Sequence, residues 1–297
     1  MKRFFILTLL GFFGVCLTLS AAEQTDFDFA SALFGEKDFY RAISFYKRFV
    51  FFNPSSPKLN EARYRIGQCY QKGKQADLAI ENFLMIPATN SLGPLSRFQI
   101  GYTKYLNGYF PQAAVDLAQF TRDFQSIPLT GDAKYLAGLS LVNVGLWKQA
   151  RAFFTNLSSI GPDCAYRSAC TNLAALCLKG DRLPRKAPWL AGVMSAIIPG
   201  LGQVYSDRYL DGLSAFLITG GLGTITAYCF LDDKIDDAFG YVAGVFGAVY
   251  YIANIYGAVN AAQNGNMIIR ENYKNHVLQA APRFKDPGLD ISFSRKY

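Results

Sequence analysis

The sequence contains little of what most enzyme sites use. Its 297 residues include a single histidine, His276, which stands in a polar stretch near the end of the chain. We find no nucleophile motif, metal-binding pair or phosphate-binding loop, and no pair of acids that would share a pocket within one unit. We therefore expect no enzymatic activity, no catalytic residue, no metal site and no cofactor.

Paired cysteines and basic stripes are also missing. Cys164, Cys170 and Cys177 cluster without the C-x-x-C spacing of a zinc site. Cys170 and Cys177 lie two helical turns apart, too far for an undistorted disulfide, so we expect buried, small apolar side chains. The net charge of +8 is spread along the chain, which predicts no nucleic-acid partner.

A local pattern around an alanine recurs four times in the first half. The alanines are Ala42, Ala79, Ala113 and Ala150, at spacings of 37, 34 and 37 residues. Large residues follow each alanine four positions later, at Tyr46, Phe83, Leu117 and Phe154. Small residues precede each alanine by twelve positions, at Ala30, Gly67, Gly101 and Gly138. A period near 34 predicts two-helix units that stack to bury their apolar faces.

In such a unit the small residues let the two helices approach closely, and we expect the large residues to fill the gap to the next unit. The pattern resembles the tetratricopeptide repeat (TPR) family from about Asp28 to Pro162. It departs seven residues after each alanine, where the family prefers alanine and this chain has Phe49, Ile86, Phe120 and Leu157. The segment Tyr166–Gly180 fits a fifth, incomplete unit that caps the array.

The resemblance implies a concave groove lined by the first helix of each unit. Aromatic side chains there make good peptide anchors. For the tyrosines at 64, 102 and 135 a groove position and a core position fit equally well, while the core is favoured for the phenylalanines. The groove residues are expected to be Phe27, Phe34, Tyr64, Gln68, Gln71, Phe98, Tyr102, Tyr105 and Tyr135.

The chain begins with features of an export signal. Lys2 and Arg3 precede an apolar run from Phe4 to Leu19, and Ser20-Ala21-Ala22 provides a cleavage site before Glu23. An uncleaved N-terminal anchor is the alternative. Both interpretations place the repeats outside the cytoplasm, which predicts a bacterial inner-membrane protein with its repeat domain on the periplasmic side.

Three apolar stretches follow Lys186, at Pro188–Tyr205, Leu213–Leu231 and Phe239–Val259. Crossing the hydrocarbon core takes about 20 apolar residues, so the second and third should span, and the first spans as a broken helix or re-enters. The sequence thus predicts an all-α protein, a TPR-like helical-hairpin solenoid followed by a small transmembrane bundle. The expected boundaries are 1–22 for the signal, 23–180 for the repeats, 187–262 for two to three membrane helices, and 263–297 for a polar basic tail.

The most distinctive run in this half resembles the P-G-L-G-Q-x-Y motif of small bacterial membrane modules of unknown function, and more distantly the two-transmembrane-helix domain. We expect Pro199 and the following glycines to end a helix and free backbone groups. Polar neighbours would satisfy those groups. We therefore expect a structural hairpin between two helices rather than a substrate site. The candidate motif residues are Pro199, Gly200, Gly202, Gln203, Tyr205, Asp207 and Arg208.

Small residues four apart also let helices pack in lipid, which predicts lipid contact and a homo-oligomer through the faces at Gly192, Ala196, Gly200, Gly240 and Gly244. Asn254 is expected to bond across helices. The charges favour three spans, with the acidic loop 232–238 outside and the basic tail inside. With two spans, the tail would lie outside with the repeats.

Two functions remain in view. The favoured one is a membrane-anchored periplasmic scaffold that binds a protein or peptide partner through the groove, in envelope assembly or secretion. The alternative is a small transport or lipid-handling module in the membrane half that the repeats regulate.

Overall fold

The computed structural model describes residues 26–158, 166–231 and 237–284. The chain divides into two units, one made of Met1–Leu178 with Leu278–Tyr297 and the other of Lys179–Val277. The regular secondary structure of the described residues is entirely helical. The export signal and Cys164 lie outside the described residues, as does most of the acidic loop.

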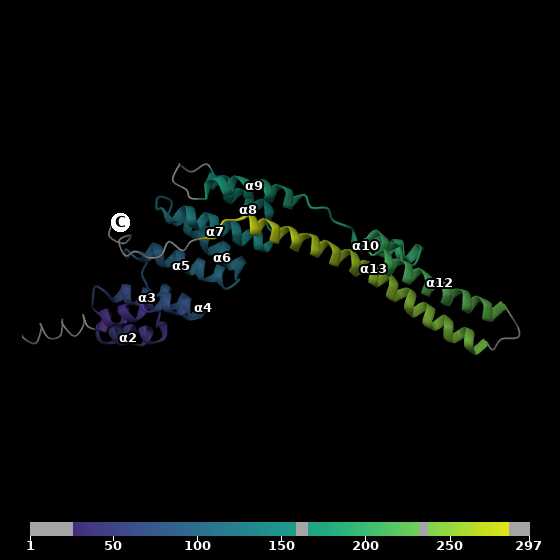
Figure 1. Ribbon diagram of the computed structural model, residues 1–297, viewed down its shortest axis with the longest axis horizontal. Coiled ribbons are helices and arrows are strands. Elements are labelled where there is room, and N and C mark those ends of the chain that lie inside the picture. Colours follow the sequence, from purple (N-terminus) through teal and green to yellow (C-terminus); the bar gives the residue numbers. More distant parts are fainter. Residues whose placement is uncertain (1–25, 159–165, 232–236, 285–297) are drawn as a thin grey trace, which may run out of the picture. The chain divides into compact units, whose positions relative to one another are not determined.

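The first unit is a run of consecutive packed helices (Figure 1). A helix at residues 26–35 precedes α2. The helices that follow are α2 (Phe39–Phe52), α3 (Leu59–Lys72), α4 (Ala76–Leu84), α5 (Gly93–Leu106), α6 (Phe110–Asp123), α7 (Leu129–Val144), α8 (Trp147–Ser158) and α9 (Arg167–Asp181). From α2 to α8 each helix packs against the next. The repeat-like, all-α architecture expected from the alanine period is therefore confirmed.

The alanine pattern marks the second helix of each pair. The side chains of Ala42, Ala79, Ala113 and Ala150 are fully buried. The helices α2, α4, α6 and α8 begin three residues before these alanines, at Phe39, Ala76, Phe110 and Trp147. One repeating pattern therefore fixes both where the second helix starts and which face it buries.

The large residue four positions after each alanine lies over the small residue of its own pair. A Cβ atom built on Gly67 would stand 2.6 Å from Phe83 Cε1, and one on Gly101 would stand 2.7 Å from Leu117 Cγ. We expected these large side chains to fill the gap to the next unit, and the structure contradicts this. They close the space within a pair, because glycine removes the side chain that would hold the two helices apart.

The departure from the TPR pattern is accommodated by aromatic packing. Phe49 is fully buried and its ring centroid lies 5.3 Å from that of Phe27. Phe120 packs against Phe98 in the same way, at 5.8 Å. Edge-to-face contacts at these distances stabilise beyond the area they bury.

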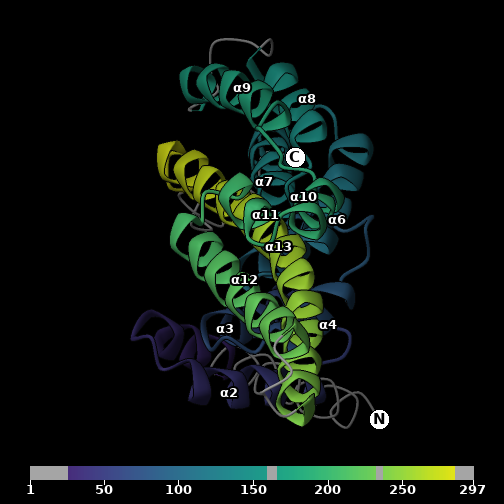
Figure 2. The same ribbon diagram turned by 90° about the vertical axis from the view of Figure 1, so that its right-hand side faces the viewer.

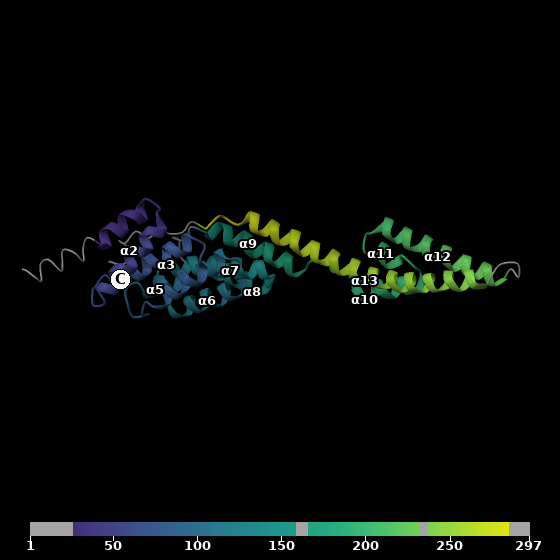
Figure 3. The same ribbon diagram turned by 90° about the horizontal axis from the view of Figure 1, so that it is seen from below.

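The described helices that follow α9 belong to the second unit (Figures 2 and 3). They are α10 (Pro188–Ile197), α11 (Leu201–Tyr205), α12 (Tyr209–Leu231) and α13 (Asp237–Ala280). The last two lie side by side, and a Cβ on Gly240 would stand 2.9 Å from Cys229 Cβ. α13 has 44 residues and continues as helix beyond Gln263, where the sequence suggests a polar tail.

Two helices are long and apolar enough to cross a membrane, Tyr209–Leu231 and Ala238–Ala280. Only 11% and 17% of their most apolar windows are buried, so they are not core helices wrapped by protein. Side chains such as Leu217, Phe246 and Ile252 are more than half exposed. Exposed apolar surface on this scale suits membrane anchoring.

Candidate functional site

Most of the expected groove side chains are packed inside the first unit. Phe98 and Tyr135 are fully buried, and Tyr64 is 2% exposed. Phe27 and Tyr102 are also buried, at 6% and 8%. These side chains are therefore buried rather than exposed on an open groove wall. For the tyrosines this is the second of the two positions that their spacing allowed, and for the phenylalanines it is the favoured one. Phe34 and Tyr105 are half-buried.

The two groove glutamines also point inward. Gln71 is 7% exposed, and its Nε2 donates to Gln99 Oε1 at 2.9 Å and to Thr103 Oγ1 at 2.8 Å. These bonds join α3 to α5 across two successive pairs. Gln68 Oε1 accepts from Arg65 at 3.1 Å. Because buried polar groups are costly unless bonded, the bonds of Gln71 fix the register of the two neighbouring pairs, whereas the Gln68 bond lies within α3.

One part of the expected groove is occupied by the chain itself. After α13, residues 281–284 return to the first unit. The hydroxyl of Tyr135 donates to the carbonyl oxygen of Pro282 at 2.6 Å. The ring of Phe284 lies 5.1 Å from Tyr102, in an edge-on arrangement. Its centroid also lies 6.2 Å from Phe98 and 6.3 Å from Tyr166.

We call the site formed by Phe98, Tyr102, Tyr135 and Tyr166 the aromatic slot. Tyr135 and Tyr166 stack in parallel with centroids 4.2 Å apart, so the residue that precedes α9 completes the slot. Burial raises the pKa of Tyr135, which keeps its hydroxyl protonated as a donor. The slot offers one hydrogen-bond donor and an aromatic enclosure, a combination that binds a peptide carbonyl and a ring.

Sequence reasoning found three of the four slot residues and missed Tyr166. It also missed Pro282 and Phe284, because no local pattern shows that a segment more than a hundred residues away returns to the array. Pro282 does carry one signal. A proline disfavours helix in the residue before it, which marks the end of α13.

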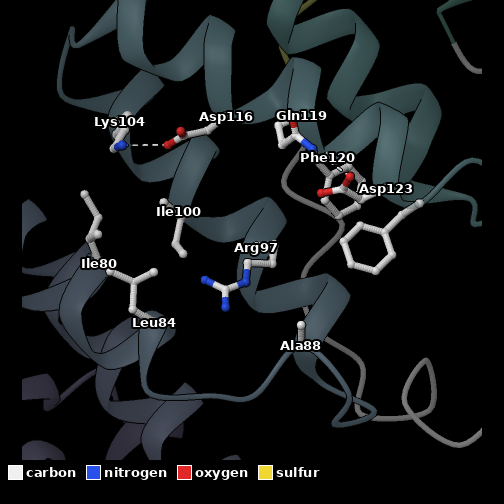
Figure 4. Close-up of a pocket in the computed structure, with 11 residues that line it drawn as sticks. Ile80, Leu84, Ala88, Arg97, Ile100, Lys104, Asp116, Gln119, Phe120 and Asp123 are labelled. Carbon is white, nitrogen blue, oxygen red and sulfur yellow. Dashed lines mark hydrogen bonds and ion pairs between the residues drawn. The ribbon is translucent and has the colours of Figure 1, made fainter.

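A separate hollow of about 270 Å³ lies between α4, α5 and α6 (Figure 4). Lys104 forms an ion pair with Asp116 at 2.6 Å, and Gln119 donates to Asp123 at 2.7 Å. Arg97 points into the hollow (Figure 4) and has no hydrogen bond or ion pair to the residues that the structure describes. The hollow is smaller than most ligand pockets, and we assign it no ligand.

The P-G-L-G-Q-x-Y run folds into a tight junction between α10, α11 and α13. Gln203 donates through Nε2 to both the backbone oxygen and Oδ1 of Asn254, at 3.0 and 2.8 Å. Its Oε1 accepts from Ser195 Oγ at 2.9 Å. Ser195 Oγ in turn accepts from the backbone N–H of Gly202 at 3.0 Å. The expected bond of Asn254 across helices is thus present.

This network leaves few polar groups available to bind a substrate. Both amide hydrogens of Gln203 and its oxygen are already bonded within the chain. A buried polar network with every member satisfied fixes a helix junction. The arrangement therefore gives no support to a transport site at these residues.

The glycines of the run are required by close contacts. Gly200 has a positive φ of 88°, and a Cβ there would stand 2.0 Å from Gly212 O. A Cβ on Gly202 would stand 2.0 Å from Ala191 O. Pro199, which is half-buried, precedes this turn at the break between α10 and α11.

The remaining motif residues act differently from our expectation. We expected Gln203, Asp207 and Arg208 to satisfy backbone groups freed at the break, but Ser195 bonds Gly202 instead. Asp207 pairs with Lys186, and Arg208 pairs with Asp211 at 2.6 Å. The hydroxyl of Tyr205 accepts from the backbone N–H of Ala187 at 3.1 Å, which anchors the start of α10.

The small-residue faces are used within the chain. A Cβ on Gly192 would stand 2.9 Å from Val259 Cγ2 of α13, and one on Gly244 would stand 3.4 Å from Thr226 of α12. These faces hold α10 and α12 against α13, and a homo-oligomer through them is not needed to explain their composition.

In the described parts of the chain, no group of three or more His, Cys, Asp or Glu residues is placed to hold a metal ion. The side chains of Cys170 and Cys177 are fully buried, in line with the expectation that they act as small apolar residues. No protein-family model matches the chain, and the comparison with curated proteins finds no match. The fold thus defines the chain as an all-α, repeat-like protein with two membrane-length helices.

Proposed function

We propose that the protein is a membrane-anchored scaffold whose TPR-like array binds a protein partner through the aromatic slot. The observation that carries this proposal is the contact between the slot and residues 282–284. There the array holds this segment by the carbonyl oxygen of Pro282 and the ring of Phe284. Nothing in the site favours catalysis, so we propose a binding role without enzymatic activity.

The anchor in this proposal is the hairpin of α12 and α13. Pro282 and Phe284 belong to the same unit as the array, which supports placing the array and the segment after α13 on one side of the membrane. An even number of spans follows. The two helices of membrane length then cross, and α10, with ten residues, does not.

This arrangement replaces the three-span topology that the charges favoured. The basic residues Lys179, Arg185 and Lys186 lie on the array side together with Arg270 and Lys274. That distribution runs against the positive-inside rule if the array is exported. The periplasmic orientation that we propose therefore rests on the N-terminal export signal, since the first segment usually dominates.

The proposal is tested by photo-crosslinking in cells. A photoreactive amino acid in place of Tyr105, which packs beside the slot, should form a discrete adduct with one partner protein. The adduct should disappear when Tyr102→Ala disrupts the slot. The same amino acid at Val115, which is 64% exposed on α6, serves as the control. An adduct that is identical at both positions and insensitive to Tyr102→Ala would contradict the proposal.

A further inference from the structure

The segment that fills the slot is short and mostly solvated. Pro282 and Arg283 are exposed, and Phe284 is half-buried. The slot therefore contacts one carbonyl oxygen and one ring, and it leaves the side chains of Pro282 and Arg283 in solvent. Any peptide that presents an aromatic side chain two residues after an accessible carbonyl offers the same two groups.

We infer that the slot selects extended segments of this kind, and that residues 281–284 are a built-in competitor that must leave before a partner enters. The inference rests on the proposed function and adds the partner's chemistry and its regulation. The contacts of Phe284 with Phe98, Tyr102 and Tyr166 identify this segment as the present occupant of the slot.

The competition follows from covalent attachment. A tethered segment has an effective concentration of the order of millimolar. If the tethered segment itself binds the slot with an intrinsic dissociation constant near 100 µM, a partner segment would therefore bind the intact chain about tenfold more weakly than a chain with an empty slot. The side chains of Pro282 and Arg283 are already exposed, so release of the segment requires only the Pro282 carbonyl and the Phe284 ring to leave the slot.

The test uses the full-length protein in detergent micelles and a fluorescent peptide, Gln-Ala-Ala-Pro-Arg-Phe, which copies residues 279–284. Binding is measured by fluorescence anisotropy. We expect the peptide to bind Phe284→Ala about tenfold more tightly than the wild type. Arg283→Ala, which changes an exposed neighbour, should match the wild type. A peptide with alanine in place of phenylalanine should bind neither protein.

A second variant tests whether the peptide binds in the slot rather than elsewhere on the protein. In the Phe284→Ala background, Tyr135→Phe removes the hydroxyl that donates to the carbonyl and should weaken peptide binding about two- to tenfold. Phe284→Leu keeps apolar bulk in the array if Phe284→Ala fails to fold. It should give an affinity between those of the wild type and the emptied slot.

Equal affinity for the wild type and for folded Phe284 variants would overturn the inference. The crosslinked adduct at Tyr105 would still appear in that case if the proposed function holds, so the two failures can be told apart. A wild-type dimer that dissociates in Phe284→Ala would place the segment of a second copy in the slot, and it would also overturn the arrangement within one chain.

Discussion

The ring of Phe154 lies over Gly138, so that a Cβ atom on the glycine would stand 2.6 Å from Phe154 Cε1. Gly138→Ala should therefore force α7 and α8 apart and lower the stability of the first unit by about 1–3 kcal/mol. Unfolding in urea, followed by the fluorescence of buried Trp147 in a Trp189→Phe background, measures this.

Gly35→Ala is the matched control, because nothing lies within 4 Å of a Cβ at that helical position. It should leave the urea midpoint unchanged or raise it slightly. If both alanine variants unfold at the wild-type midpoint, the close approach of α7 and α8 is not what the glycine provides.

The junction of the second unit has a similar requirement. Gly202→Ala would place a methyl group 2.0 Å from Ala191 O and should separate α10 from α11. We expect a lower thermal midpoint in detergent, followed by Trp189 fluorescence. Gly220→Ala on α12 meets nothing within 4 Å and should behave as the wild type. Equal loss in both variants would point to glycine flexibility rather than to packing.

The side of the membrane on which each segment lies can be tested with a membrane-impermeant maleimide. Cysteines in place of Ser91 and Arg283, both exposed, should be labelled from the same side. A cysteine in place of Lys234 should be labelled only from the other side. Labelling of Arg283→Cys together with Lys234→Cys would refute the two-span arrangement.

The native cysteines in the described part of the chain are buried and should add little background to this experiment. Cys69 and Cys177 are buried, and burial raises the pKa of each thiol to about 12. Maleimides react with the thiolate, so these residues should stay unlabelled until the protein is denatured.

Asp132 in the first turn of α7 makes the stability of the array depend on pH. Burial raises the pKa of this carboxyl from 3.8 to about 6, so the folded state holds the proton more tightly than the unfolded chain. Stability should therefore fall as pH rises from about 4 to about 6 and then level off. Asp132→Asn cannot ionise, so it should lose this decline and be more stable than the wild type at pH 7.

Urea midpoints between pH 4 and pH 7 measure the effect. Asp77→Asn, an exposed first-turn aspartate of α4, is the matched control and should follow the wild-type curve. If the curves of Asp132→Asn and the wild type run parallel, desolvation of Asp132 does not contribute.

The sequence predicted the first unit well because its packing is local and repeated. Gly101 and Leu117 are sixteen residues apart, and the same spacing returns in each of the three glycine-containing pairs. The groove was predicted less well, because whether Tyr64 faces a partner or the core depends on the helices beside it. The occupant of the slot was not predictable, since Tyr135 and Pro282 are 147 residues apart and share no pattern.

In the membrane half, too, local features are predictable from the sequence and long-range contacts are not. The lengths and composition of α12 and α13 predict membrane helices, and the glycines predict close approach. The hydrogen bonds between Gln203 and Asn254 could not be predicted from the sequence, because an isolated glutamine in an apolar run does not indicate which residue it will contact.

The chain leaves the first unit after Leu178 and returns to it at Leu278. The second unit, with its hairpin of α12 and α13, is thus inserted into the first unit, and the segments before and after it both belong to that first unit. A nonsense mutation after Ala280 would not merely shorten a tail. It would remove Pro282 and Phe284 and so empty the aromatic slot, whose residues stand more than a hundred positions earlier in the sequence.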